Sequence, residues 1–144
     1  MCTGLILSLL GGIDGSFNSL ASAYKISTDG TWNQVPTMEN ARYGHACLVH
    51  EGFLFVIGGV GADTSVEKIK LGTLTWETGP GLNKGFAYGQ AIMYQDTIFL
   101  VYKGGQVVKL NTEDKWEDVA DLGGSIGSRP VFPAPILTTA AIGC

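Results

Sequence analysis

The amino-acid sequence predicts an all-β domain made of short strands joined by tight turns. Glycine accounts for 21 of the 144 residues, roughly twice its average share, and such an excess is typical of chains with many turns. No long stretch of the chain shows the hydrophobic period of an amphipathic helix. The three tryptophans, Trp32, Trp76 and Trp116, recur at nearly even spacing, which indicates a repeated supersecondary unit.

An apolar strand that ends in a pair of glycines is expected in each unit. The strand shows no alternation of polar and apolar residues, which indicates that both of its faces are covered. Glycines at its end allow backbones to approach closely, because no Cβ atom intrudes. The three strands with their glycine pairs are residues 5–10 with Gly11 and Gly12, residues 53–57 with Gly58 and Gly59, and residues 98–102 with Gly104 and Gly105.

A loop, a strand of alternating residues and a polar turn follow each glycine pair and lead to the tryptophan. The alternating strands are residues 24–26, 69–71 and 108–110. The tryptophan is large enough to fill a gap between neighbouring sheets. A further strand carries Tyr-Gly-x-Ala at 43–46 and again at 88–91. Each unit is therefore predicted to contain four short strands.

The ordered set of paired glycines, a tryptophan and an Arg-x-x-His-Ala segment resembles the kelch repeat. The resemblance covers nearly the whole chain, and the second unit matches best. The third unit departs from the pattern, because Gly89 and Gln90 stand where the arginine and histidine are expected. The signature positions are Gly11, Gly12, Tyr24, Trp32, Arg42, His45, Gly58, Gly59, Trp76, Gly104, Gly105 and Trp116.

The resemblance implies a kelch-type β-propeller with about three four-stranded blades in one domain, residues 1–144. The expected blades are residues 1–38, 39–82 and 83–122, and residues 123–144 form a partial closing segment or the start of a further blade. Propellers close with about four to eight blades. The sequence therefore indicates an incomplete ring, which is that of a fragment, a truncated gene model or a degenerate copy. The alternative is a chain that completes a ring by self-association.

The function that the resemblance implies is that of a protein-binding scaffold. In kelch propellers, loops on one rim contact partners, and here these loops contain the candidate partner-binding residues Asp14, Phe17, Asn18, Asp63 and Thr64. Phe17 is the candidate anchor, because it is an aromatic residue on a polar loop. The alternative for Phe17 is packing against its own blade. The alternative for Asp14 and Asp63 is a role in stabilising turns.

Two other functions are kept as alternatives. The first is the substrate-recognition part of a ubiquitin-ligase adaptor whose BTB domain is missing from this sequence. The second is the remnant of a galactose-oxidase-like copper enzyme. We expect no enzyme, catalytic residue, metal site or cofactor, because His45 and Cys47 share one strand face while His50 points the other way. His45 is expected to form a hydrogen bond with a neighbouring strand, and Cys47 to pack as a small hydrophobic residue.

Charge and hydropathy restrict the partners. The net charge is −4 with no basic cluster, which argues against nucleic acid. No apolar run reaches the length of a membrane span, and residues 5–10 lack the preceding basic residues of a secretion signal. A bridge between Cys2 and Cys144 stays open. The compartment is unassigned: the family default is the cytoplasm, and an extracellular location is compatible with the sequence.

Overall fold

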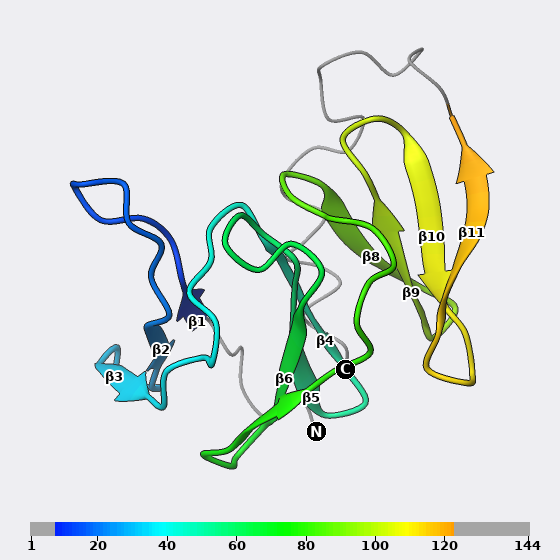
Figure 1. Ribbon diagram of the computed structural model, residues 1–144. Helices are drawn as coiled ribbons and strands as arrows, with labels where there is room; N and C mark the ends of the chain where they lie inside the picture. Colours follow the sequence, from blue (N-terminus) through cyan, green and yellow to red (C-terminus); the bar gives the residue numbers. More distant parts are fainter. Residues whose placement is uncertain (1–7, 123–144) are drawn as a thin grey trace.

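The computed structural model describes residues 8–122, which form an all-β structure without a helix (Figure 1). Its eleven strands make three separate antiparallel sheets, which we call the first, second and third sheet and which have three, four and four strands. The strands are β1 Ser8–Leu10, β2 Ala23–Ile26, β3 Trp32–Val35, β4 Ala46–His50, β5 Phe53–Ile57, β6 Val66–Lys70, β7 Trp76–Thr78, β8 Gln90–Tyr94, β9 Thr97–Val101, β10 Gln106–Leu110 and β11 Trp116–Asp121.

Each sheet is a meander in which strands adjacent in the chain are adjacent in space. The first sheet contains β1 to β3, the second β4 to β7 and the third β8 to β11. The apolar strands β1, β5 and β9 correspond to one another, and a tryptophan opens each of β3, β7 and β11. The all-β prediction is therefore confirmed for the described residues. The segment 123–144 and the cysteines at positions 2 and 144 lie outside them.

The three sheets stand beside one another in chain order (Figure 1). Strand β4, which opens the second sheet, lies against β8, which opens the third. Apolar side chains from both sheets and from the segment between them meet in one core, and burial of each large side chain contributes about 1.5–3 kcal/mol. The core residues are Ala46, Leu48, Phe55, Ile57, Val66, Leu82, Phe86, Ala91, Ile98, Leu100, Val108 and Trp116.

The first two glycine pairs mark the points where the chain of the next sheet crosses. Gly11 and Gly58 have φ angles of 57° and 61°, and a Cβ atom on either would lie 2.4 Å from a backbone oxygen of the crossing segment. The second glycine of each pair donates its N–H to that same oxygen, which belongs to Arg42 or to Phe86. Close approach requires glycine here, as the sequence predicted.

The tryptophans join neighbouring sheets. The indole Nε1 of Trp76 donates a hydrogen bond of 2.7 Å to the carbonyl oxygen of Pro36, in the segment that follows the first sheet. In the same way, Nε1 of Trp116 donates to the oxygen of Pro80, also at 2.7 Å, after the second sheet. The two boundaries between sheets are thus built alike.

Candidate functional site

The connection that follows the apolar strand differs in length among the three sheets. It comprises residues 11–22 in the first sheet, 58–65 in the second and 102–105 in the third, so it shortens by four residues at each step. In Figure 1 the first connection, in dark blue, extends well away from its sheet. Gly61 of the second connection lies close to Ser19 of the first, because a Cβ atom there would lie 3.2 Å from Ser19 Oγ. The two longer connections therefore adjoin on one rim.

Residues 13–19 form a closed excursion at the tip of the first connection. Ile13 and Ser19 pair through an isolated antiparallel β-bridge. Asp14 organises the turn: its Oδ1 accepts the backbone N–H groups of Ser16 at 2.8 Å and Asn18 at 2.9 Å, and its Oδ2 accepts the Asn18 amide at 3.0 Å. The Asn18 side chain, followed by these backbone donors, lowers the pKa of Asp14 below its usual value. The turn is therefore held by its own polar groups.

Phe17 is presented to solvent by this turn. Its backbone has a φ of 63°, which is rare for a residue other than glycine, and its N–H donates 3.0 Å to the carbonyl oxygen of Asp14. The residue is 82% exposed. It does not pack against its own sheet, so the structure decides between the two alternatives for its place: the ring projects outward.

Asp63 and Thr64 occupy the second connection in a different way. Their carbonyl oxygens accept the N–H groups of Phe86 at 2.8 Å and Leu82 at 2.9 Å, which hold the segment that leads into the third sheet. Their side chains are exposed. The structure therefore places Asp63 and Thr64 on the same rim as Phe17, with a structural use for their backbone that the sequence did not reveal.

A buried ion pair supports the second connection from below. Arg42 is completely buried, and its Nη1 donates to the carbonyl oxygens of Gly58 at 2.9 Å and Ser65 at 3.0 Å. Its Nη2 donates to Ser65 Oγ and forms an ion pair with the buried carboxylate of Glu67. Glu67 also accepts the N–H of Glu39 at 2.6 Å. Arg42 thus fixes the rim without reaching its surface.

The residues considered as metal ligands behave otherwise than expected. Within residues 8–122 the His45 side chain forms no hydrogen bond with a neighbouring strand, and its buried Nδ1 has no partner there, which corrects that prediction. Burial, and then the positive charge of Arg42, lower the pKa of His45. Cys47 is exposed rather than packed, because β4 presents it away from the core. Within residues 8–122, no group of three or more His, Cys, Asp or Glu side chains could hold a metal ion.

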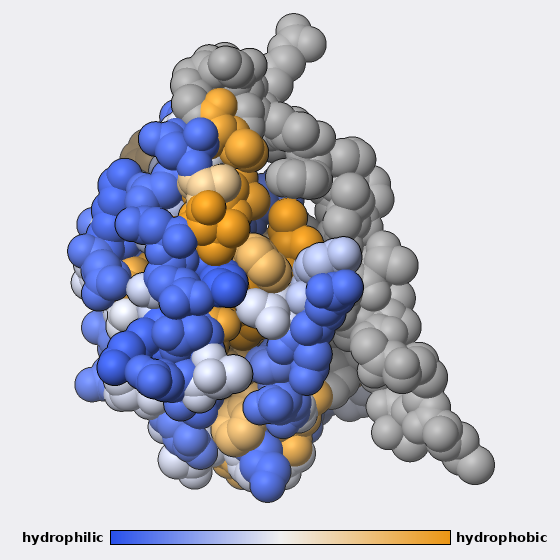
Figure 2. All heavy atoms as spheres, turned by 90° about the vertical axis from the view of Figure 1, so that its right-hand side faces the viewer, coloured by the Kyte–Doolittle hydropathy of each residue, from blue (hydrophilic) through white to orange (hydrophobic). Residues whose placement is uncertain are grey.

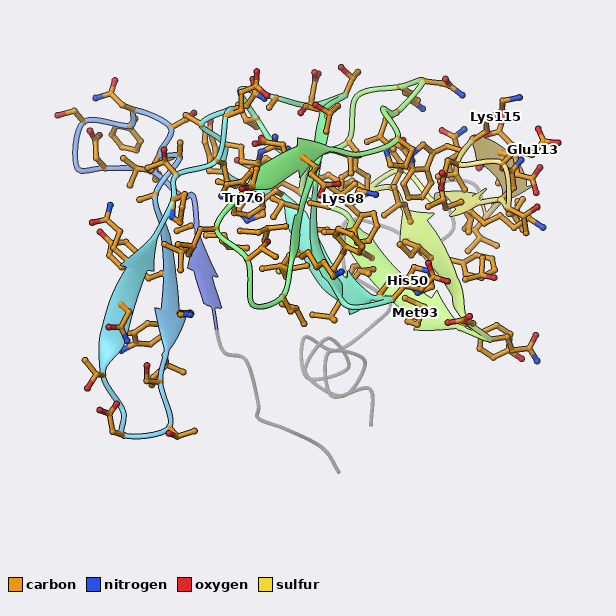
Figure 3. All side chains as sticks on the ribbon, turned by 90° about the horizontal axis from the view of Figure 1, so that it is seen from below. His50, Lys68, Trp76, Met93, Glu113 and Lys115 are labelled. Atoms are coloured by element: carbon orange, nitrogen blue, oxygen red, sulfur yellow. The ribbon has the colours of Figure 1, made fainter. Side chains whose placement is uncertain are left out.

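Sequence reasoning missed a cleft at the opposite ends of the strands. It has a volume of about 390 Å³ and lies between the hairpin turns of the second and third sheets. His50 Nδ1 is 3.6 Å from Asp96 Oδ1 across it, and Lys68 Nζ is 4.6 Å from the ring centre of Phe53. Figure 3 shows His50, Lys68 and Met93 on this side. The matching hairpins, residues 50–52 and 95–97, were the signal in the sequence.

Comparison with known proteins adds no relative to this description. No family model matches the chain, and no curated protein matches it at a significant level of similarity. In the part of the chain that the structure describes, no helix is long and apolar enough to cross a membrane.

Proposed function

We propose that the chain is a kelch-type β-propeller scaffold that binds another protein through the rim formed by residues 11–22 and 58–65. The recurring meanders, glycine crossings and tryptophan bonds between sheets support this architecture, because repeat units of this kind bury their faces only against neighbours. Phe17 is the anchor residue. The observation that carries the proposal is the exposure of its ring on a turn held by Asp14.

An exposed aromatic ring on a held turn suits binding for two physical reasons. Aromatic side chains are enriched at the buried centres of protein interfaces, where they contribute a large apolar area. A turn that is already ordered loses little conformational entropy when a partner docks. The Asp14 hydrogen bonds therefore place Phe17 in the conformation that a partner would otherwise have to impose.

The chemistry of the rim suggests the chemistry of the partner. Residues 11–22 and 58–65 contain Asp14 and Asp63 but neither lysine nor arginine. A matching surface has an apolar pocket for the ring and basic or N–H groups around it. The described residues give no specific support to the ubiquitin-ligase or copper-enzyme alternatives.

Quantitative affinity capture with Phe17→Ala tests the proposal. Loss of an anchor costs about 2 kcal/mol or more, so binding of each captured partner weakens by roughly 30-fold or more. Tyr94→Ala is the matched control, because Tyr94 is an exposed aromatic residue beside the hairpin end of the third sheet. A partner set that Phe17→Ala leaves unchanged, or that Tyr94→Ala reduces equally, contradicts Phe17 as the anchor.

A further inference from the structure

The boundary between one sheet and the next contains a second repeated contact besides the tryptophan bond. Met38, Leu82 and Leu122 follow the last strands of the three sheets, and each donates its N–H back to its own sheet. The acceptors are the carbonyl oxygens of Ala21 at 2.9 Å, Thr64 at 2.9 Å and Gly105 at 3.0 Å. The three residues are therefore equivalent positions of the repeat.

The side chains at these positions are buried only where another sheet packs beyond them. Met38 is 3% exposed and Leu82 is 7% exposed, and Leu82 belongs to the core that the second and third sheets share. Leu122 is 47% exposed, and Val119 on the preceding strand β11 is exposed as well. Figure 2, which faces the third-sheet side of the molecule, shows apolar side chains gathered in a band on this surface. The third sheet thus displays the half of a boundary that receives a following sheet.

The first sheet displays the other half. Trp32 corresponds to Trp76 and Trp116, yet it is 43% exposed, and no residue among 8–122 accepts its indole N–H. Strand β1 lies at the edge of the described sheet, whereas its counterparts β5 and β9 are interior strands. A carbonyl oxygen in the place that the oxygens of Pro36 and Pro80 take at the other two tryptophans would accept the indole N–H of Trp32.

We propose that two copies of this chain associate head to tail, with the Trp32 side of each copy docked on the Leu122 side of the other. The occupant is a second copy because the chain itself carries both complementary halves of a boundary that it builds twice internally. The described residues of two copies supply six sheets, within the roughly four to eight that close a propeller. Closure gives two identical contacts, and the second forms within one complex, which strengthens the pair.

Sedimentation analysis of the full chain tests this proposal over a range of concentrations. The expected species has twice the 15.2 kDa mass of the chain. Trp32→Ala and Leu122→Asp each shift the mass towards the monomer, because each change damages both contacts. Trp32→Phe, which keeps a ring but lacks the N–H, shifts it less. Leu74→Asp is the matched control: Leu74 is exposed in the turn between β6 and β7, away from both ends, so the dimer persists.

Mixing the two defective chains distinguishes a head-to-tail contact from a symmetric one. A dimer of one Trp32→Ala chain and one Leu122→Asp chain contains one fully intact contact, so the equimolar mixture recovers dimer that neither variant forms alone. A monomeric natural chain at every concentration, a Leu122→Asp variant that stays dimeric while it is folded, or an open-ended polymer in place of a closed pair would each overturn the proposal.

Discussion

The second and third sheets each accept an equivalent backbone hydrogen bond from the glycine pair of the preceding sheet. The buried side chains of the two acceptor residues have opposite chemistry. The N–H of Gly12 donates 2.9 Å to the carbonyl oxygen of Arg42, and the N–H of Gly59 donates 2.7 Å to that of Phe86. The two acceptor residues, Arg42 and Phe86, are completely buried. The guanidinium of Arg42 forms an ion pair and polar contacts. The ring of Phe86 instead packs edge to face on the ring of Tyr102, with 5.1 Å between the ring centres.

The partners on the neighbouring strand follow the same division. Val66 pairs with Ile57 in the second sheet, and the next residue along the strand is Glu67. Val107 pairs with Val101 in the third sheet, and the next residue is Val108. A carboxylate and an isopropyl group therefore occupy corresponding buried positions. The repeat thus keeps the path of the backbone constant, while its interior accepts either an ionic or an apolar filling.

Removal of Glu67 should produce the largest effect on this comparison. Glu67→Ala leaves the Arg42 guanidinium buried without its counter-ion and frees the N–H of Glu39. Such changes cost about 3–5 kcal/mol of unfolding free energy. The corresponding Val108→Ala leaves no buried charge, so it should cost less. Urea denaturation at one fixed protein concentration measures both values.

The control is a double variant in which the second sheet receives an apolar pair like that of the third sheet. Arg42→Met combined with Glu67→Leu removes both charges together, and the double variant should recover most of the stability that Glu67→Ala loses. A double variant no more stable than Glu67→Ala would show that the second sheet requires ions and that the two fillings are not interchangeable.

The glycine pairs give the second, intermediate prediction. In Gly58→Ala the new Cβ would lie 2.4 Å from the Phe86 oxygen at a φ of 61°, so the variant should lose more than about 2 kcal/mol. Gly104→Ala is the matched change in the third sheet, where a Cβ meets nothing within 4 Å. It should be neutral or stabilise by about 0.4–1 kcal/mol. Equal losses in thermal unfolding would refute the distinction.

The sequence predicted the fold better than it predicted the roles of individual residues. Residues 53–57 coincide with β5 because a strand covered on both faces is apolar throughout, and that signal is local. The third apolar strand lies one residue earlier than predicted, at Thr97–Val101, and Gly104 serves a hairpin turn instead of a crossing. Tyr102 and Lys103 precede that glycine pair, so the pair does not end the strand directly.

The remaining errors concern contacts between distant residues. The sequence analysis placed Gly89 and Gln90 where the arginine and histidine were expected, whereas the structure puts Phe86 in the position of Arg42. No local sequence pattern indicates that an apolar residue, Phe86, replaces the charged Arg42 at this position of the repeat. The exposure of Phe17, by contrast, depends on local hydrogen bonds, because the Asp14 carboxylate accepts N–H groups only two and four residues away.

The third and smallest predicted effect is on the pH dependence of the unfolding free energy. The His45 contribution should be lost at acidic pH and the Tyr102 contribution at alkaline pH. The pKa of His45 is lowered by burial and by Arg42, so its neutral form favours folding, and this contribution is lost as the pH falls below 6.5. The pKa of Tyr102 is raised by burial and by Asp118, so its contribution is lost as the pH rises above 10.0. In urea unfolding, His45→Asn should flatten only the acidic limb, and Tyr102→Phe only the alkaline one. A variant that changes both limbs alike would show that the two fillings are not independent.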